Sequence, residues 1–308
     1  MKKTNDLLFD IETGISGDTA ETSAFVRAPA SDSAPVILYY VTDPICSHCW
    51  AIEPVLRRFL TMYQGELTVR IVMGGLLEKW HGGPVDPANG IHGPEDVAGH
   101  WREVGEHARM PIDGSLMKTN PLASSYPPSR VFKVVETIHG KEAAVQCLRR
   151  MREALFIGNR NIGEATVLRE ILSDMGLDGE RIVTEADGER GHALLMEDFA
   201  LARSLRARAF PTIIMVNEKN EGVRIVGGRP LETYIDGLKK LRGKEVKAGP
   251  VPDLPVLLKD EQLLFAKEIE VLYEVAPAEA KAFVERQLSE ESYEIQMFLS
   301  EWYVRRTN

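Results

Sequence analysis

Runs of apolar residues at two different spacings divide much of the chain into predicted strands and helices. Residues 36–41 are continuously apolar, as in a strand that is covered on both faces. Residues 66–73 alternate between polar and apolar side chains and predict a second strand. Residues 50–63, between them, carry apolar side chains at helical spacing, so the two strands should lie parallel in one sheet.

Two further strands and a helix are predicted farther along the chain. Residues 211–217 and 222–226 are rich in apolar, β-branched side chains, and the short polar link between them predicts a hairpin. A helix is expected at 231–241. We therefore expect one α/β domain, formed by residues 35–75 and 207–243.

The interval between these two parts, residues 76–206, is patterned as helices. Apolar residues recur at helical spacing over 94–109, 130–139, 141–156, 161–175 and 178–206. A loop rich in serine and proline, residues 120–128, precedes the second of these helices, and Ser129 could cap it. We expect an inserted all-helical domain here.

The two ends of the chain differ from this body. Residues 1–34 have no sustained period and predict a mobile N-terminal tail, although residues 7–9 could pair as an edge strand. Residues 244–255 are rich in proline and glycine and predict a linker. Residues 256–308 then predict a C-terminal helical extension. Its three amphipathic helices are expected at 260–275, 277–288 and 291–305.

Composition narrows the class of protein. The chain has 308 residues, of which 44% are hydrophobic and 27% charged, as in a soluble globular protein. Its net charge of −9 argues against a general nucleic-acid surface, and no apolar run approaches the length of a membrane span. Acidic residues interrupt any export signal near the start, and three cysteines are too few for a disulfide scaffold. We expect a cytoplasmic protein with no membrane or nucleic-acid partner.

Two cysteines follow the first strand directly, in the sequence Cys46-Ser47-His48-Cys49. Across the first turn of a helix, this spacing brings two thiols close enough to bridge. Cys46 would lie near unpaired N–H groups and the positive end of the helix dipole, where a cysteine pKa falls from about 8.5 to roughly 3.5–7.5. We predict Cys46 as the attacking sulfur, Cys49 as the more buried resolving sulfur, and His48 as a cation that stabilises the thiolate. Trp50 is expected to shield the buried sulfur.

Other interpretations of the cysteines carry less weight. A zinc site would need two further ligands, and the sequence has no second Cys-x-x-Cys and no His-x-x-x-His. Two incidental core cysteines are a further alternative. The third cysteine, Cys147, lies on the apolar side of a predicted helix and is expected to be an inert core thiol. We expect no metal and no cofactor.

A proline opens the third predicted strand, in Phe210-Pro211-Thr212. Proline is tolerated at the first residue of a strand, and an X–Pro bond is where a cis peptide costs only about 0.5–1 kcal/mol. A cis Pro211 packed against the dithiol would expose the backbone of Phe210 to an extended substrate. An ordinary trans proline is the alternative.

The dithiol and the proline together resemble the thioredoxin fold, and the helical interval between them resembles the DsbA branch of that fold. Asp43-Pro44-Ile45-Cys46 and residues 120–127 resemble the cytosolic FrnE-like and SpxH-like members, over roughly residues 36–243. SpxH-like proteins also carry a helical C-terminal extension. The resemblance implies that the 120–127 loop lies near the dithiol and helps to form a substrate groove. The substrate-binding residues expected on this basis are Phe210, Thr212, Trp50, Ser125 and Tyr126.

The resemblance implies a thiol–disulfide oxidoreductase or isomerase that acts on protein thiols and disulfides, with Cys46, Cys49, His48 and Pro211 as its catalytic residues. SpxH-like proteins are instead adaptors that deliver the transcription factor Spx to the ClpXP protease. An Spx-like regulator or a protease is therefore the alternative partner. A small-molecule enzyme of the FrnE-like or chromene-carboxylate isomerase kind is a third alternative, against which the two cysteines argue.

Overall fold

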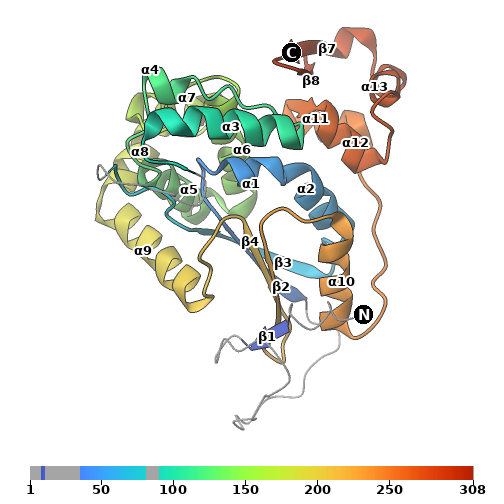
Figure 1. Cartoon of the computed structure of the whole chain (residues 1–308), viewed down its shortest axis with the longest axis horizontal. Helices are drawn as coiled ribbons and strands as arrows, with labels where there is room; N and C mark the ends of the chain where they lie inside the picture. The colour runs from blue at the N-terminus through green and yellow to red at the C-terminus, as the bar shows by residue number, and fades with distance from the viewer. Residues whose placement is uncertain (1–7, 11–34, 81–89, 308) are drawn as a thin grey trace.

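The computed structural model describes residues 8–10, 35–80 and 90–307 and centres on a five-stranded sheet (Figure 1). Its strands, in spatial order, are β1 (Leu8–Asp10), β5 (Glu221–Val226), β4 (Thr212–Val216), β2 (Val36–Thr42) and β3 (Leu67–Met73). Strand β2 is parallel to β3, and the other pairs are antiparallel, which confirms the predicted parallel pair and hairpin. The predicted tail lies outside the described residues except for β1, which forms the edge pairing considered for residues 7–9.

Helices cover both faces of the sheet because successive residues of a strand point to opposite sides. These helices are α1 (Ser47–Ala51), α2 (Glu53–Met62), α9 (Glu189–Ser204) and α10 (Leu231–Arg242). On one face, Leu38 and Tyr40 of β2 pack with α2 and α10. On the other face, Val41 and Ile214 pack with α9. Strand β2 continues through a short turn into α1, so the Cys-x-x-Cys motif lies at the end of a central strand (Figure 1).

The inserted domain is helical, as predicted. It contains α3 (Pro94–Ala108), α4 (Leu116–Thr119), α5 (Tyr126–His139), α6 (Lys141–Phe156), α7 (Ala165–Asp174), α8 (Gly179–Asp187) and α9. Helix α5 begins four residues before the predicted start, because Pro127 and Pro128 fit into a first helical turn. Ser129 therefore lies inside the helix and does not cap it. Among the described helices, none is both long and apolar enough to cross a bilayer.

The C-terminal extension has helices and a small sheet. Its elements are α11 (Leu254–Glu261), β6 (Leu263–Phe265), α12 (Ala266–Tyr273), α13 (Ala280–Gln287), β7 (Tyr293–Phe298) and β8 (Glu301–Arg306). The helix predicted at 291–305 is wrong, because this segment forms the β7–β8 hairpin. Its aromatic and β-branched residues favour strands, and Leu299, at φ 52°, turns the chain between them. Strand β6 pairs with β8 and completes the three-stranded sheet.

Candidate active site

The two cysteines occupy the first turn of α1. Cys46 is the N-cap residue, and its Sγ accepts a hydrogen bond from the Cys49 backbone N–H at 3.2 Å. Both residues are free thiols. Cys46 is 4% exposed, whereas Cys49 is completely buried. Of the two residues, only Cys46 keeps any exposure, as expected of an attacking cysteine beside a buried resolving one.

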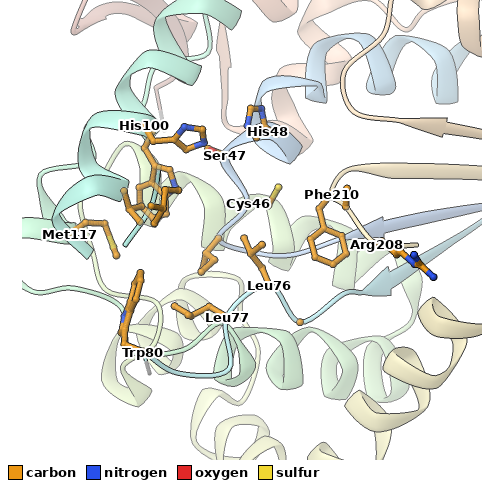
Figure 2. A pocket seen from close by; sticks show the side chains of 16 residues that line it. Cys46, Ser47, His48, Leu76, Leu77, Trp80, His100, Met117, Arg208 and Phe210 are labelled. Carbon is orange, nitrogen blue, oxygen red and sulfur yellow. The ribbon is translucent and has the colours of Figure 1, made fainter. Parts of the chain in front are cut away.

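Cys46 borders a cavity of about 530 Å³ between the thioredoxin-like part and the inserted domain (Figure 2). Most of the lining is apolar, and it includes Leu76, Leu77, Trp80, Ile91, Trp101 and Met117. Three basic side chains, His48, His100 and Arg208, also belong to the lining, and the Arg208 guanidinium points away from Cys46 (Figure 2). The His48 and His100 rings meet edge-on with their centroids 5.2 Å apart. A cavity of this composition suits an apolar side chain or a small apolar group next to a reactive thiol.

The Phe210–Pro211 peptide bond is cis, as the sequence interpretation required. Pro211 is buried, and the half-buried Phe210 lines the cavity on the side opposite Trp80 and Met117 (Figure 2). The Phe210 ring lies directly against Gly74, because a Cβ atom built there would be 2.0 Å from its Cε1. Gly74 thus leaves the space that the Phe210 ring occupies.

Asp43 holds the turn before Cys46 in place. Its carboxylate is fully buried and accepts hydrogen bonds from the Ile45 N–H at 3.1 Å, the Leu76 N–H at 2.8 Å and the Ser125 hydroxyl at 2.9 Å. One carboxylate thus connects the dithiol turn, the segment after β3 and the start of α5. Burial raises the pKa of Asp43 to about 6, although the hydrogen bonds and Arg152 oppose this shift.

Burial and mutual contact shift the pKa values of the two thiols in opposite directions. Burial raises the pKa of Cys46, and neighbouring Cys49 adds to the rise. Burial also raises the pKa of Cys49, but a hydrogen bond from Cys46, the charge of Arg152 and the Thr42 hydroxyl outweigh it, so this pKa is lowered. The lowered pKa that the sequence predicts for Cys46 is thus found on Cys49 instead. The first negative charge belongs to the pair, with the remaining proton on Cys46.

The structure brings together some predicted site residues and separates others. Cys46, His48 and Phe210 line the cavity. Trp50, Ser125 and Thr212 are completely buried, so their predicted contact with substrate is corrected to a supporting position. Ser125 holds Asp43, the Thr212 hydroxyl donates to the Ala209 carbonyl at 2.7 Å, and Trp50 packs between Phe156 and Phe265. Tyr126 is partly buried and meets Phe199 edge-on, with ring centroids 5.2 Å apart.

Sequence reasoning missed most of the cavity lining. Leu76 and Leu77 follow the second predicted strand, His100 and Trp101 lie on α3, and Met117 lies on α4. No local pattern distinguishes an apolar residue at a cavity from one in a closed core. Cys147 agrees with its predicted core position, because it is completely buried and burial raises its pKa to about 12.

A dithiol at a helix N-terminus beside a cis proline, on a sheet with a helical insertion, defines the class of thioredoxin-fold proteins. A protein-family model described as Thioredoxin matches residues 39–236, so the chain belongs to this family. Solved structures of similar proteins share this fold.

One curated protein and two solved structures are similar to much of this chain. The ClpXP adapter protein SpxH of Halalkalibacterium halodurans is 27% identical over 265 residues, covering 85% of each chain. Among solved structures, a protein from Nitrosomonas europaea described as a protein disulfide isomerase has a TM-score of 0.55 and 20% identity, over 68% of this chain and 96% of its own. The cytosolic disulfide reductase DsbM of Pseudomonas aeruginosa has a TM-score of 0.50 and 23% identity, over 67% of this chain and 95% of its own. At these identities the two structures establish a shared fold.

Proposed function

We propose that this protein is a cytoplasmic thiol–disulfide oxidoreductase that acts on protein substrates through Cys46 and Cys49. One observation carries the proposal: the two sulfurs share a helix turn, and only Cys46 opens onto the cavity beside Phe210. The apolar lining suits a side chain that flanks a substrate disulfide in an unfolded or exposed segment.

The reaction follows from the arrangement of the two sulfurs. Cys46 passes its proton to the Cys49 thiolate as its sulfur attacks one sulfur of the substrate disulfide. The substrate S–S bond breaks, a mixed disulfide forms on Cys46, and the other substrate sulfur leaves as a thiolate that takes a proton from solvent. Cys49 then loses its proton and attacks Cys46, which releases the second substrate thiol. The substrate gains two electrons, and the protein ends with a Cys46–Cys49 disulfide.

Reduction of insulin in the presence of a thiol reductant tests this proposal. The wild type is expected to turn over, and Cys46→Ser is expected to fall to the uncatalysed rate because no other accessible thiol borders the cavity among the described residues. Cys49→Ser is expected to accumulate a mixed disulfide on Cys46, visible as a mass adduct that a reductant removes. Cys147→Ser is the matched control and should retain wild-type turnover. A folded, reduced wild type without turnover would rule out the proposal.

A second function, that of an adaptor, is favoured by the extent of one comparison. The match to the SpxH relative covers 85% of this chain, more than residues 1–243 contain, so it reaches into the C-terminal extension. The solved oxidoreductase structures cover only 67–68%. An adaptor would bind an Spx-type regulator and increase its degradation by ClpXP. A reconstituted degradation assay tests this: faster loss of the regulator with both Cys46→Ser and the wild type would support an adaptor that does not need the dithiol.

A further inference from the structure

Arg152 reaches from the inserted domain to the base of the dithiol turn. It lies on α6 and is only 1% exposed. Its Nη2 donates to the Thr42 hydroxyl at 2.6 Å and to the Asp43 carbonyl at 3.1 Å. Thr42 ends β2, and Asp43 begins the turn into Cys46. The guanidinium is therefore fixed beneath the segment that carries the two sulfurs.

The guanidinium of Arg152 shares its carboxylate partner with a second arginine. Its one carboxylate partner among the described residues is Glu53, at 2.7 Å. Glu53 also binds Arg149 at 2.5 Å, although Arg149 has further carboxylate partners in Glu153 and Glu268. The Nε atom of Arg152 is buried and has no hydrogen-bond partner within the described part of the chain. Such a charge, in surroundings of low polarity, acts strongly on any neighbouring ionisable group.

The groups that face the dithiol come from several elements. Tyr40 on β2 donates to the Cys49 carbonyl at 3.4 Å, and Asp43 lies in the turn. His48 on α1 and His100 on α3 lie on the cavity side, while Glu53 on α2 and Arg152 on α6 lie on the buried side. Arg152 is thus a fixed positive charge on the buried side of the sulfurs, and it is the one that binds the dithiol turn. It also lowers the pKa of both thiols against the effect of burial.

We infer that Arg152 is a positioning residue for the dithiol: its guanidinium stabilises the single negative charge that the two sulfurs share, and Glu53 limits how strongly it does so. This inference rests on the proposed oxidoreductase function. Stabilising a thiolate favours the reduced dithiol over the disulfide and makes the protein more oxidising. The inserted domain thereby contributes to the redox chemistry of a motif that lies outside it.

The redox step is measured against glutathione. Oxidation of the dithiol forms the Cys46–Cys49 bond and releases two protons and two electrons. Glutathione disulfide accepts the electrons, and its own S–S bond breaks to give two glutathione thiols. The equilibrium between these pairs reports how strongly the protein favours its reduced form.

Two variants with opposite expected shifts test the inference. Arg152→Met removes the positive charge, so the first pKa of the dithiol should rise by about one unit and the glutathione equilibrium should move about tenfold toward the protein disulfide, equivalent to about 30 mV for a two-electron couple. Glu53→Gln removes the opposing negative charge, so the pKa should fall and the equilibrium should move toward the dithiol. Arg160→Gln is the control, because this arginine of the same domain pairs with Glu170 on the surface.

The pKa is measured from the ultraviolet absorbance of the thiolate as pH is varied, and this titration needs no turnover. A loss of insulin reduction with normal titration shifts would therefore count against the proposed function and not against Arg152. Shifts of the same sign in Arg152→Met and Glu53→Gln would overturn the inference, as would shifts no larger than that of Arg160→Gln. Arg152→Lys, which keeps the charge, should restore part of the pKa and of the equilibrium. If Arg152→Met does not fold, the opposite shift expected of Glu53→Gln still decides the question.

Discussion

The two sides of the dithiol differ in almost every physical respect. On the side of Cys46 lies an open, mostly apolar cavity bordered by Phe210. On the side of Cys49 lie charged side chains, among them the buried Arg152 and the partly buried Glu53. The first side can admit a substrate to Cys46, whereas on the second side Cys49 is completely buried, so that the charges there act on the sulfurs through their electric field. The comparison shows that access and reactivity are supplied to the dithiol by different parts of the chain.

The charged side continues beyond the dithiol to the C-terminal extension. Arg149 binds Glu53 at 2.5 Å and also binds Glu268 of α12 through both of its terminal nitrogens, at 2.9 Å each. Arg149 is 5% exposed, and Glu268 is fully buried. Since both charges are removed from water, each depends on the other for its solvation. This ion pair therefore fastens α12 to α6 next to the buried side of the active site.

The largest effect is expected from breaking this connection. Glu268→Ala would leave Arg149 buried with one acid fewer and should lower the free energy of unfolding by about 3–5 kcal/mol. Glu274→Ala is the matched control, since this residue pairs with Arg58 at 2.5 Å but is 74% exposed, and such pairs contribute about 0–1 kcal/mol. Urea unfolding of both variants measures the difference. Equal losses would mean that the buried pair does not hold the extension.

A smaller effect, with a defined pH dependence, is expected at Asp43. The pKa of the folded carboxyl is about 6, above its ordinary value of 3.8. The folded protein thus holds a proton that the unfolded chain has lost between these values. The raised pKa therefore adds about 3 kcal/mol to the free energy of unfolding below about pH 4. This contribution is lost as the pH rises through about 6.

Asp43→Asn cannot titrate, so this dependence should disappear from it. The measurement is the free energy of unfolding of both proteins at several values between pH 4 and pH 7. Subtracting the two curves removes the contributions of other carboxyl groups. A difference that stays constant across this range would contradict the raised pKa. If the wild type instead gained stability relative to Asp43→Asn as the pH rises, the pKa of Asp43 would be lowered and not raised.

Local patterns predicted the central sheet and the dithiol well. The strand expected at 36–41 is β2, and the alternating segment at 66–73 is β3, because side-chain periodicity directly reflects the two faces of a sheet. The dithiol and the cis proline were found from short motifs whose chemistry depends on neighbouring residues. The position of Cys46 at the start of α1 could therefore be predicted from the residues around it.

Features that depend on distant partners could not be predicted in this way. The β7–β8 hairpin is completed by β6, about thirty residues earlier, and its pattern alone suited a helix. In sequence the charges of Arg149 and Arg152 look like those of a solvated helix face, because the acids that pair with them, Glu53 of α2 and Glu268 of α12, are distant along the chain. The same holds for Ser125, which is buried by its contact with Asp43. Each of these residues takes its role from a contact that sequence spacing does not encode.

The smallest of these effects on stability is expected from a substitution at Gly74. The same substitution tests the cavity side of the dithiol. A Cβ atom there would lie 2.0 Å from the Phe210 ring, so Gly74→Ala must displace this ring from its place beside the cavity. Because Phe210 is half-buried and can move, the cost in stability should be at the lower end of the 1–3 kcal/mol typical of overpacking.

The effect of Gly74→Ala should instead appear in catalysis. We expect kcat/KM for insulin to fall about tenfold, or about 1.4 kcal/mol in transition-state stabilisation, while the dithiol pKa stays unchanged. Gly65→Ala is the control, because no heavy atom lies within 4 Å of its added Cβ. If Gly74→Ala kept full kcat/KM, Phe210 would not contact the substrate. If it shifted the dithiol pKa instead, the cavity and the charged side would not act as separately as their structures indicate.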